Sequence, residues 1–320
     1  MSTGLLNWSF NTLYIGLRHF HGTVFGVVAS LVTAFEAVFK KYMEGSNPLP
    51  MATRDTLLDL DLRPVDCYYR LRRDDNDGKR VIYVHITDIS IIPEDSRTSN
   101  DELIPALSKL SGWYDKWDTL TVSRLGDAVH CAQNHFKTHT LPPENVVGGY
   151  PFFDILNLRV VSRKKYRVKY VYNGSELCYL KVARFNFEVG WVRRELEAIY
   201  TLAERKSQLG PELLGYAFEG SRERVIGFLT KAIPGRPAHI SDLEDCKQAL
   251  GELHASGLLH GDLVKDNILI TSEGPRFIDF DDSTPQTCND LERWNAMKEQ
   301  ELGSLEVALL DSSGRGRPWD

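Results

Sequence analysis

The chain has 320 residues, 42% of them hydrophobic, which suffices for one large domain or two of ordinary size. Its 38 basic and 44 acidic residues give a formal net charge of −6, so the chain lacks the basic field of a general nucleic-acid binder. The five cysteines are widely spaced without a Cys-x-x-Cys pair, which argues against a disulfide framework and favours a reducing, cytoplasmic location.

The first 50 residues contain one long apolar run, residues 22–39, which Glu36 interrupts. A clean membrane-spanning helix needs about 20 apolar residues, and this run falls short of that. We therefore expect residues 1–50 to form a buried or amphipathic helix followed by a linker, with a membrane-associated helix as the alternative. Lys40 and Lys41 suit either a helix end or an anionic membrane surface.

Residues 51–150 are predicted to form a mixed α/β extension. The alternating stretches CYYRLRR and RVIYVHI flank the turn DDNDGK, whose Asp-Gly pair supplies a positive φ, so a β-hairpin is expected over residues 67–86. Helices are expected over residues 101–111 and 124–136.

The second of these helices would place Cys131, His135 and His139 four residues apart on one face. Three such side chains can bind zinc. No fourth ligand is evident nearby, and histidines are common on solvated helix faces, so the sequence favours an ordinary helix over a metal site.

From residue 155 the pattern indicates strands, one helix, more strands and a second helix. Residues 158–172 alternate with period two, as a strand pair does. The second helix opens at SDLE, read as a capping box with Ser241 at the N-cap and Glu244 at N3, and Gly257 ends it. The remaining elements are strands over 177–185, 211–218 and 224–233, a helix over 188–205, a hairpin over 267–280 and a helix over 290–310.

The stretch LLHGDLVKDNILIT, residues 258–271, places several polar side chains between apolar runs. The strands NILIT and RFIDF form a hairpin, which brings Asn267 at the start of one strand near Asp279 at the end of the other. Asp262 lies in the loop that leads into this hairpin. Oxygen ligands of this kind suit Mg²⁺, and a carboxylate not used by the metal can orient and deprotonate a hydroxyl.

These motifs resemble the protein-kinase-like superfamily. HGDLVKDN matches its catalytic loop H-[RG]-D-x-x-x-x-N, and IDFD matches the position of its D-F-G. The HGD and DFD forms look most like aminoglycoside and choline phosphotransferases and small fungal-type kinase-like proteins. The resemblance implies ATP and Mg²⁺ as cofactors, Asp262 as the catalytic base, Asn267 and Asp279 as metal ligands, and His260 as a structural brace.

The resemblance also implies a strand lysine that holds the α- and β-phosphates and is paired with a glutamate of the next helix. Lys181 in YLKVARF fits the lysine, although an edge-strand lysine that blocks aggregation is the plain alternative. Glu195 and Glu197 both lie on the helix. At 100° per residue Glu195 falls beside the apolar stripe and Glu197 points away from it, and a core-facing glutamate needs a partner. We therefore expect a Lys181–Glu195 pair.

The adenine is expected against the connector formed by Thr230, Lys231, Ala232 and Ile233.

Two departures from the family pattern bear on function. No glycine-rich loop covers the phosphates, and only the charges of Arg163, Lys164 or Lys165 could substitute for it. Only 39 residues follow Asp281. We therefore expect an α+β, bilobal kinase-like fold with a reduced C-terminal lobe over residues 151–311, and a flexible tail over 312–320.

The predicted function is transfer of the ATP γ-phosphate to a hydroxyl acceptor, either protein Ser/Thr or a small molecule. A pseudokinase, acting as a nucleotide-binding or scaffolding module, is the alternative that the missing glycine loop suggests. A third hypothesis makes residues 1–150 a module that places the kinase-like domain at a membrane or partner. No nucleic-acid partner is expected.

Overall fold

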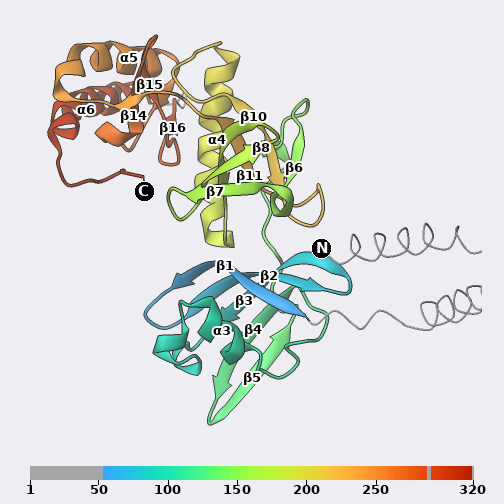
Figure 1. The fold of residues 1–320 in the computed structure, drawn as a ribbon. Coiled ribbons are helices and arrows are strands. Elements are labelled where there is room, and N and C mark those ends of the chain that lie inside the picture. Colours follow the sequence, from blue (N-terminus) through green and yellow to red (C-terminus); the bar gives the residue numbers. More distant parts are fainter. Residues whose placement is uncertain (1–52, 287–289, 319–320) are drawn as a thin grey trace, which may run out of the picture. The chain divides into compact units, whose positions relative to one another are not determined.

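The computed structural model describes residues 53–286 and 290–318. The apolar segment 22–39 and the linker after it lie outside the described residues. The described part is a mixed α+β structure with four α-helices and four β-sheets (Figure 1), in agreement with the predicted α+β class. Among these helices, none combines the length and the hydropathy needed to cross a bilayer.

The extension forms a five-stranded sheet in which the strands follow one another in chain order. The predicted hairpin is present, with Asp75 paired to Gly78 across its turn. The short helix α3 (Asn100–Leu107) contacts β1, and Trp113 and Trp117 are fully buried in the core beneath the sheet. The strands are β1 (Arg54–Leu62), β2 (Cys67–Asp75), β3 (Gly78–Ile86), β4 (Thr119–Leu125) and β5 (Ala128–Gln133).

The helix predicted over residues 124–136 is wrong, because β4 and β5 form an antiparallel hairpin there. Gly126 takes a φ of +60° at its turn, and Leu120 and Val122 alternate into the core. Cys131 therefore lies on a strand and shares no helical face with His139, which is buried and donates from Nε2 to the Ala183 carbonyl. Within the described ranges, no group of three His, Cys, Asp or Glu side chains is arranged to hold a metal ion.

A second sheet has six strands in the order β6-β10-β11-β9-β8-β7. Helix α4 (Val189–Glu204) packs on it through Val192, Leu196 and Ile199, which belong to the same buried cluster as Tyr216 and Phe228 of the sheet. The strands are β6 (Phe152–Asp154), β7 (Arg159–Arg163), β8 (Val168–Asn173), β9 (Glu176–Val182), β10 (Leu213–Phe218) and β11 (Val225–Lys231).

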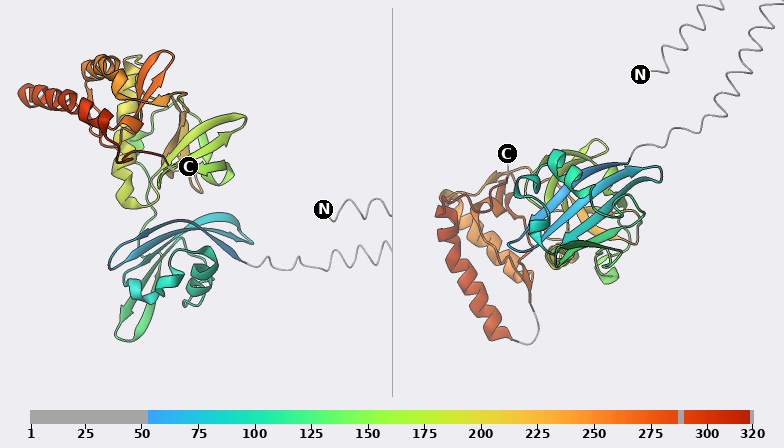
Figure 2. Two further views of the ribbon diagram at one scale, coloured as in Figure 1. Left: turned by 60° about the vertical axis from the view of Figure 1, so that its left-hand side comes forward. Right: turned by 90° about the horizontal axis from the view of Figure 1, so that it is seen from below.

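The remaining chain packs as two helices against two small sheets. Helix α6 (Leu291–Leu310) runs along α5 (Leu243–Ala255), as both views of Figure 2 show, and buries Leu305 and Leu309 there. The short strands are β12 (Arg236–Pro237), β13 (Leu258–Leu259), β14 (Ile268–Thr271), β15 (Gly274–Phe277) and β16 (Thr284–Pro285).

The capping box expected at Ser241 and Glu244 is also wrong. The chain enters α5 through a 3₁₀ turn, Ile240–Asp242, and the capping box is formed by His239 and Asp242. The His239 ring accepts from the backbone of the turn, and the Asp242 carboxylate accepts from the His239 N–H. The sequence signal was placed two residues too late, because a histidine ring can take the role that Ser and Thr usually fill.

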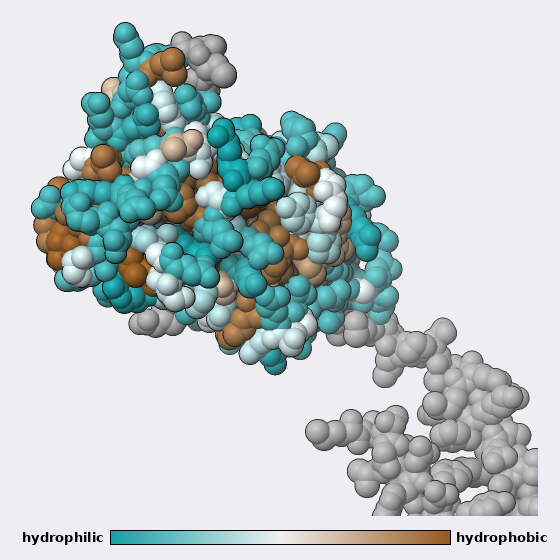
Figure 3. Space-filling model, turned by 90° about the horizontal axis from the view of Figure 1, so that it is seen from above, coloured by the Kyte–Doolittle hydropathy of each residue, from teal (hydrophilic) through white to brown (hydrophobic). Residues whose placement is uncertain are grey.

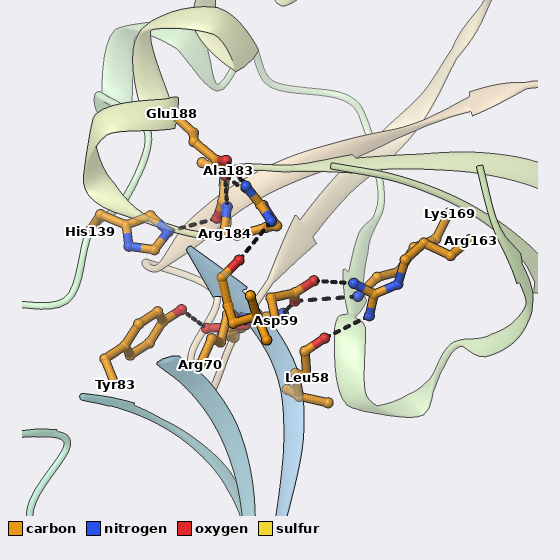
Figure 4. Close-up of polar contacts among 12 residues, drawn as sticks. Leu58, Asp59, Arg70, Tyr83, His139, Arg163, Lys169, Ala183, Arg184 and Glu188 are labelled. Carbon is orange, nitrogen blue, oxygen red and sulfur yellow. Dashed lines mark hydrogen bonds and ion pairs between the residues drawn. The ribbon is translucent and has the colours of Figure 1, made fainter. Parts of the chain in front are cut away.

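The extension and the six-stranded sheet are joined by a buried network of charged side chains (Figure 4). Arg70 of β2 is 1% exposed and pairs with Asp59 of β1 and with Glu219, which follows β10. Arg163 and Lys169, from the two ends of the β7–β8 connection, both contact Asp59, at 2.8 and 3.6 Å. Buried ion pairs of this kind hold their partners in fixed positions, since an unpaired charge there is costly.

The outer surface seen in Figure 3 is mainly hydrophilic, with separate hydrophobic patches between the charged side chains. This matches a chain in which 26% of the residues are charged.

Candidate functional site

The loop that carries the HGD sequence is held from two sides. His260 is fully buried, and its Nε2 donates to the Ile278 carbonyl at 3.0 Å while its Nδ1 accepts from the Asp262 N–H at 3.3 Å. Burial lowers the pKa of His260, so the ring is neutral and serves as a link between the loop and the strand that precedes Asp279.

Glu301 of α6 holds the same loop from the other side. Its carboxylate accepts from the backbone N–H groups of His260 and Gly261 and from the His254 ring, at 3.2, 2.7 and 2.7 Å. Burial alone would raise the pKa of Glu301, but these three hydrogen bonds outweigh it and hold the pKa below its usual range. Glu301 is therefore an ionised brace under the loop.

The geometry of the loop also requires its glycine. Gly261 has a φ of +83°, and a Cβ at that position would collide with the Asp282 carbonyl. Only glycine satisfies both conditions without strain.

Asp262 and Asn267 contact each other across the loop. The Asn267 amide group donates to the Asp262 carbonyl at 3.0 Å and to its carboxylate at 3.3 Å. The other atom of the amide, Asn267 Oδ1, is buried and accepts no hydrogen bond from the residues that the structure describes, and the same holds for Asp266 Oδ2. Buried oxygens without partners are uncommon in native structures and commonly mark a missing ion or water.

Asp279 lies at the centre of a charged cluster. Its Oδ1 accepts from Lys181 Nζ at 2.6 Å and its Oδ2 from Lys165 Nζ at 2.7 Å. Lys181 Nζ also lies 2.6 and 2.7 Å from the two carboxylate oxygens of Glu195, so the structure brings the expected pair together. Glu197, the rejected candidate, instead lies near Asn145 and Arg193.

The electrostatics follow from this arrangement. Burial alone would lower the pKa of Lys181, but Asp279 and Glu195 outweigh it and raise that pKa well above its ordinary value. Burial would likewise raise the pKa of Asp279, yet Lys181 and Lys165 hold it far below the usual range. Lysine and aspartate are therefore both charged at neutral pH.

A cavity of about 250 Å³ opens beside this cluster. Lys181, Glu195, Asn267 and Asp279 line it on one side, and Thr230, Lys231 and Ile233 of the connector line it on another. Ala232 does not line this cavity, because it faces a neighbouring one with Tyr150 and Ile199. The site therefore collects all but one of the residues expected to bind nucleotide.

The C-terminal tail lies over the same site, a placement that the sequence did not indicate. Arg315 donates to the Asp262 carboxylate, and Gly316 and Pro318 line the cavity. Lys265 Nζ donates to the Asp311 carbonyl at 2.5 Å and fixes the start of the tail.

The donor set fits a hard divalent cation. Among the described residues Asn267 Oδ1 is buried without a partner, and Asn267 and Asp279 line the same cavity. Asp262 contacts Asn267 but lines a neighbouring cavity instead. Carboxylate and amide oxygens are the ligands Mg²⁺ takes, with waters and phosphate oxygens completing its shell.

Sequence reasoning missed Glu301, Lys165 as a contact of Asp279, and Arg315. Glu301 and Arg315 are 40 and 53 residues from their partners in the loop, so no local pattern could connect them. For Lys165 the sequence does offer a local signal, because a positively charged turn stands where the family carries its glycine-rich loop.

Comparison with known protein families gives one match. Residues 185–287 match the model of the phosphotransferase enzyme family, APH. This match confirms the resemblance to the protein-kinase-like superfamily, which includes that family together with aminoglycoside and choline kinases. It covers Glu195, Asp262, Asn267 and Asp279 and begins four residues after Lys181. A search of curated proteins found no match to the chain.

Proposed function

We propose that the chain is an ATP- and Mg²⁺-dependent phosphotransferase that transfers the γ-phosphate to a hydroxyl group. The observation that carries this proposal is the Lys181 ammonium, which contacts both Glu195 and Asp279 at a cavity that Asn267 and residues of the connector also line. The family match over residues 185–287 supports a phosphotransferase of kinase-like type.

Each side chain has one role in this proposal. Lys181, held by Glu195, binds the α- and β-phosphates. Asn267 and Asp279 would hold Mg²⁺, which neutralises phosphate charge when bound. Asp262 orients the acceptor hydroxyl and accepts its proton.

His260 and Glu301 position the loop that carries Asp262, and Thr230, Lys231 and Ile233 contact the adenine. The fold that goes with these roles is bilobal, with the six-stranded sheet and α4 as the first lobe. The second lobe contains α5, α6 and the small sheets among the described residues. The acceptor hydroxyl of this proposal belongs to a small molecule or to a protein Ser or Thr.

The proposed location of the chain is the cytoplasm. Cys67, Cys131, Cys178 and Cys246 are free thiols in the structure, in keeping with a reducing, cytoplasmic compartment. Membrane association through residues 22–39 is a separate proposal, tested by fractionating cells that express the full chain and a form lacking residues 1–50.

A pseudokinase is the second candidate, and two observations favour it. Arg315 neutralises Asp262, and the cavity is smaller than the roughly 300–1,000 Å³ of typical small-molecule sites. Against it, every charged residue of the expected catalytic set is present in the sequence, and Lys181 contacts both Glu195 and Asp279.

Transfer of labelled phosphate separates the two candidates. The chain is incubated with Mg²⁺ and γ-labelled ATP, together with the small-molecule or protein fraction of a cell extract, and the label in each fraction is measured. An enzyme transfers label, and Asp262→Asn lowers the rate by about 10²–10⁴-fold while ATP still binds. A binding module gives the same background with wild type and variant.

A further inference from the structure

The turn between β7 and β8, residues 164–167 with the sequence KKYR, lies where a kinase-like fold would carry its glycine-rich loop. Such loops bind phosphate through backbone N–H groups. Here the N–H groups of Lys164 and Lys165 both donate to the Val168 carbonyl, at 2.8 and 3.2 Å. Those two donors are used within the turn, so any phosphate contact at these positions must come from side chains.

Two cations fix this turn to the segment that contains Asp279. Lys165 Nζ donates to Asp279 Oδ2 at 2.7 Å, and Arg167 Nη2 donates to Asp281 Oδ2 at 2.5 Å. Arg167 also lies 4.8 Å from the centre of the Trp191 ring on α4, while Arg194 of the same helix donates to the Asp281 carbonyl. The turn is therefore held over the site by paired contacts rather than by its own backbone.

Lys165 from the turn and Lys181 from β9 contact different oxygens of the Asp279 carboxylate. Both side chains line the cavity, and both retain some exposure, 31% and 13% respectively. Because Lys181 also pairs with Glu195, the cluster contains two ammonium groups and two carboxylates. If a divalent cation takes the Asp279 carboxylate, the Lys165 ammonium is released toward the space where the phosphates would lie, while Lys181 keeps its contact with Glu195.

We propose that Lys165 is a phosphate-binding residue that takes the place of the missing glycine-rich loop. It pairs with Asp279 when the site is empty and with the β- or γ-phosphate when Mg²⁺ and ATP are bound. Arg167 is the positioning residue that keeps the turn in place. This inference rests on the proposed function, because it names one more residue of the same nucleotide site.

The test measures two affinities that should change in opposite directions. In Lys165→Met, calorimetric titration with Mg²⁺·ATP should show binding weakened by about 10- to 100-fold, the range for loss of a charged hydrogen bond. Adenosine, which has no phosphate, should bind with unchanged affinity. Mn²⁺ without nucleotide, followed by its paramagnetic resonance signal, should bind several-fold more tightly, because the competing ammonium is gone. Lys165→Arg should restore most of the ATP affinity.

Arg163→Met is the matched control. It removes the same charge from the same connection, but Arg163 donates to Asp59 and to the Leu58 carbonyl rather than into the cavity (Figure 4). Its ATP affinity should stay within about two-fold of wild type. Equal ATP affinity in wild type and Lys165→Met would overturn the inference and leave the proposed function standing. A wild-type chain that binds no ATP at all would overturn both.

Discussion

Asp279 is the most constrained side chain of the site. Its backbone has a φ of +69°, a left-handed conformation that costs most residues about 1–2 kcal/mol and that Asp and Asn tolerate best. Each of its carboxylate oxygens accepts from a different ammonium group. The orientation of the Asp279 carboxylate is therefore fixed in the absence of ligand, as a metal or phosphate site requires.

Gly261 gives a prediction on stability at the same scale. Gly261→Ala should lower the free energy of unfolding by at least about 1–2 kcal/mol, because of its positive φ and the Asp282 carbonyl. Gly251→Ala in α5 is the control, since a Cβ there meets no atom within 4 Å, and it should stabilise by about 0.5–1 kcal/mol. Urea unfolding measures both. A Gly261→Ala variant as stable as wild type would contradict the loop geometry.

Much of this site could be predicted at the level of residues. The spacing of Asp262 and Asn267, the hairpin to Asp279 and the helical phase of Glu195 all depend on short stretches of sequence. The position of Glu301 and the approach of Lys165 depend on tertiary packing, so no local rule could supply them. The sequence marks the connector 230–233 only as one segment, and which of its residues line the cavity depends on tertiary packing, which places Ala232 at a neighbouring cavity.

At the scale of elements, local patterns predicted most strands and helices, and failed where two periods compete. Residues 124–136 contain Cys131 and His135 at helical spacing, yet TLTVSRL before them is rich in β-branched residues that alternate into a core. The strand forms because it buries Leu120 and Val122 in the core of the extension. The 3₁₀ turn at the start of α5 was not predicted, because its N-cap is His239, and the usual signals for a helix start are Ser, Thr, Asp and Asn.

The tail is the element whose placement has the clearest functional consequence. Arg315 pairs with Asp262, but its side chain is 68% exposed, and exposed pairs contribute about 0–1 kcal/mol. Arg315→Ala should therefore raise the rate of phosphate transfer by no more than about five-fold. Deleting residues 312–320 should have the larger effect, because Gly316 and Pro318 also line the cavity. Steady-state rates with labelled ATP measure both, and a loss of activity would show that the tail completes the site.

At the scale of the whole described chain, buried charged groups link the extension to the six-stranded sheet. Tyr83 of the extension donates to Glu219 at 2.6 Å, and its ring packs edge-on against His139 at 5.4 Å. His139 in turn donates to Ala183, next to the strand that carries Lys181. The extension is thus hydrogen-bonded to the sheet whose strands line the candidate site, which explains why two sequence segments of different character share one compact unit, Thr53–Asp320.

This linkage predicts a loss of stability in acid. Burial lowers the pKa of His139 from 6.5 to about 4. Between pH 6.5 and pH 4 the imidazole is therefore protonated in the unfolded chain and neutral in the folded chain. The free energy of unfolding should fall as pH drops from 6.5 toward 4, by up to about 3 kcal/mol. His139→Gln can keep the donor but does not titrate, and it should lose this part of the slope. Urea unfolding at several pH values measures the difference, and parallel curves for both proteins would refute the prediction.

The most direct measurement is a calorimetric titration with ATP, with and without Mg²⁺, of wild type and Asp279→Asn. Asparagine keeps the shape and tolerates the left-handed backbone, so only the negative charge is lost. We predict that wild type binds ATP more tightly when Mg²⁺ is present and that Asp279→Asn loses this enhancement. If ATP binds wild type and variant alike, or fails to bind either in both conditions, the cluster around Lys181 and Asp279 is not a nucleotide site.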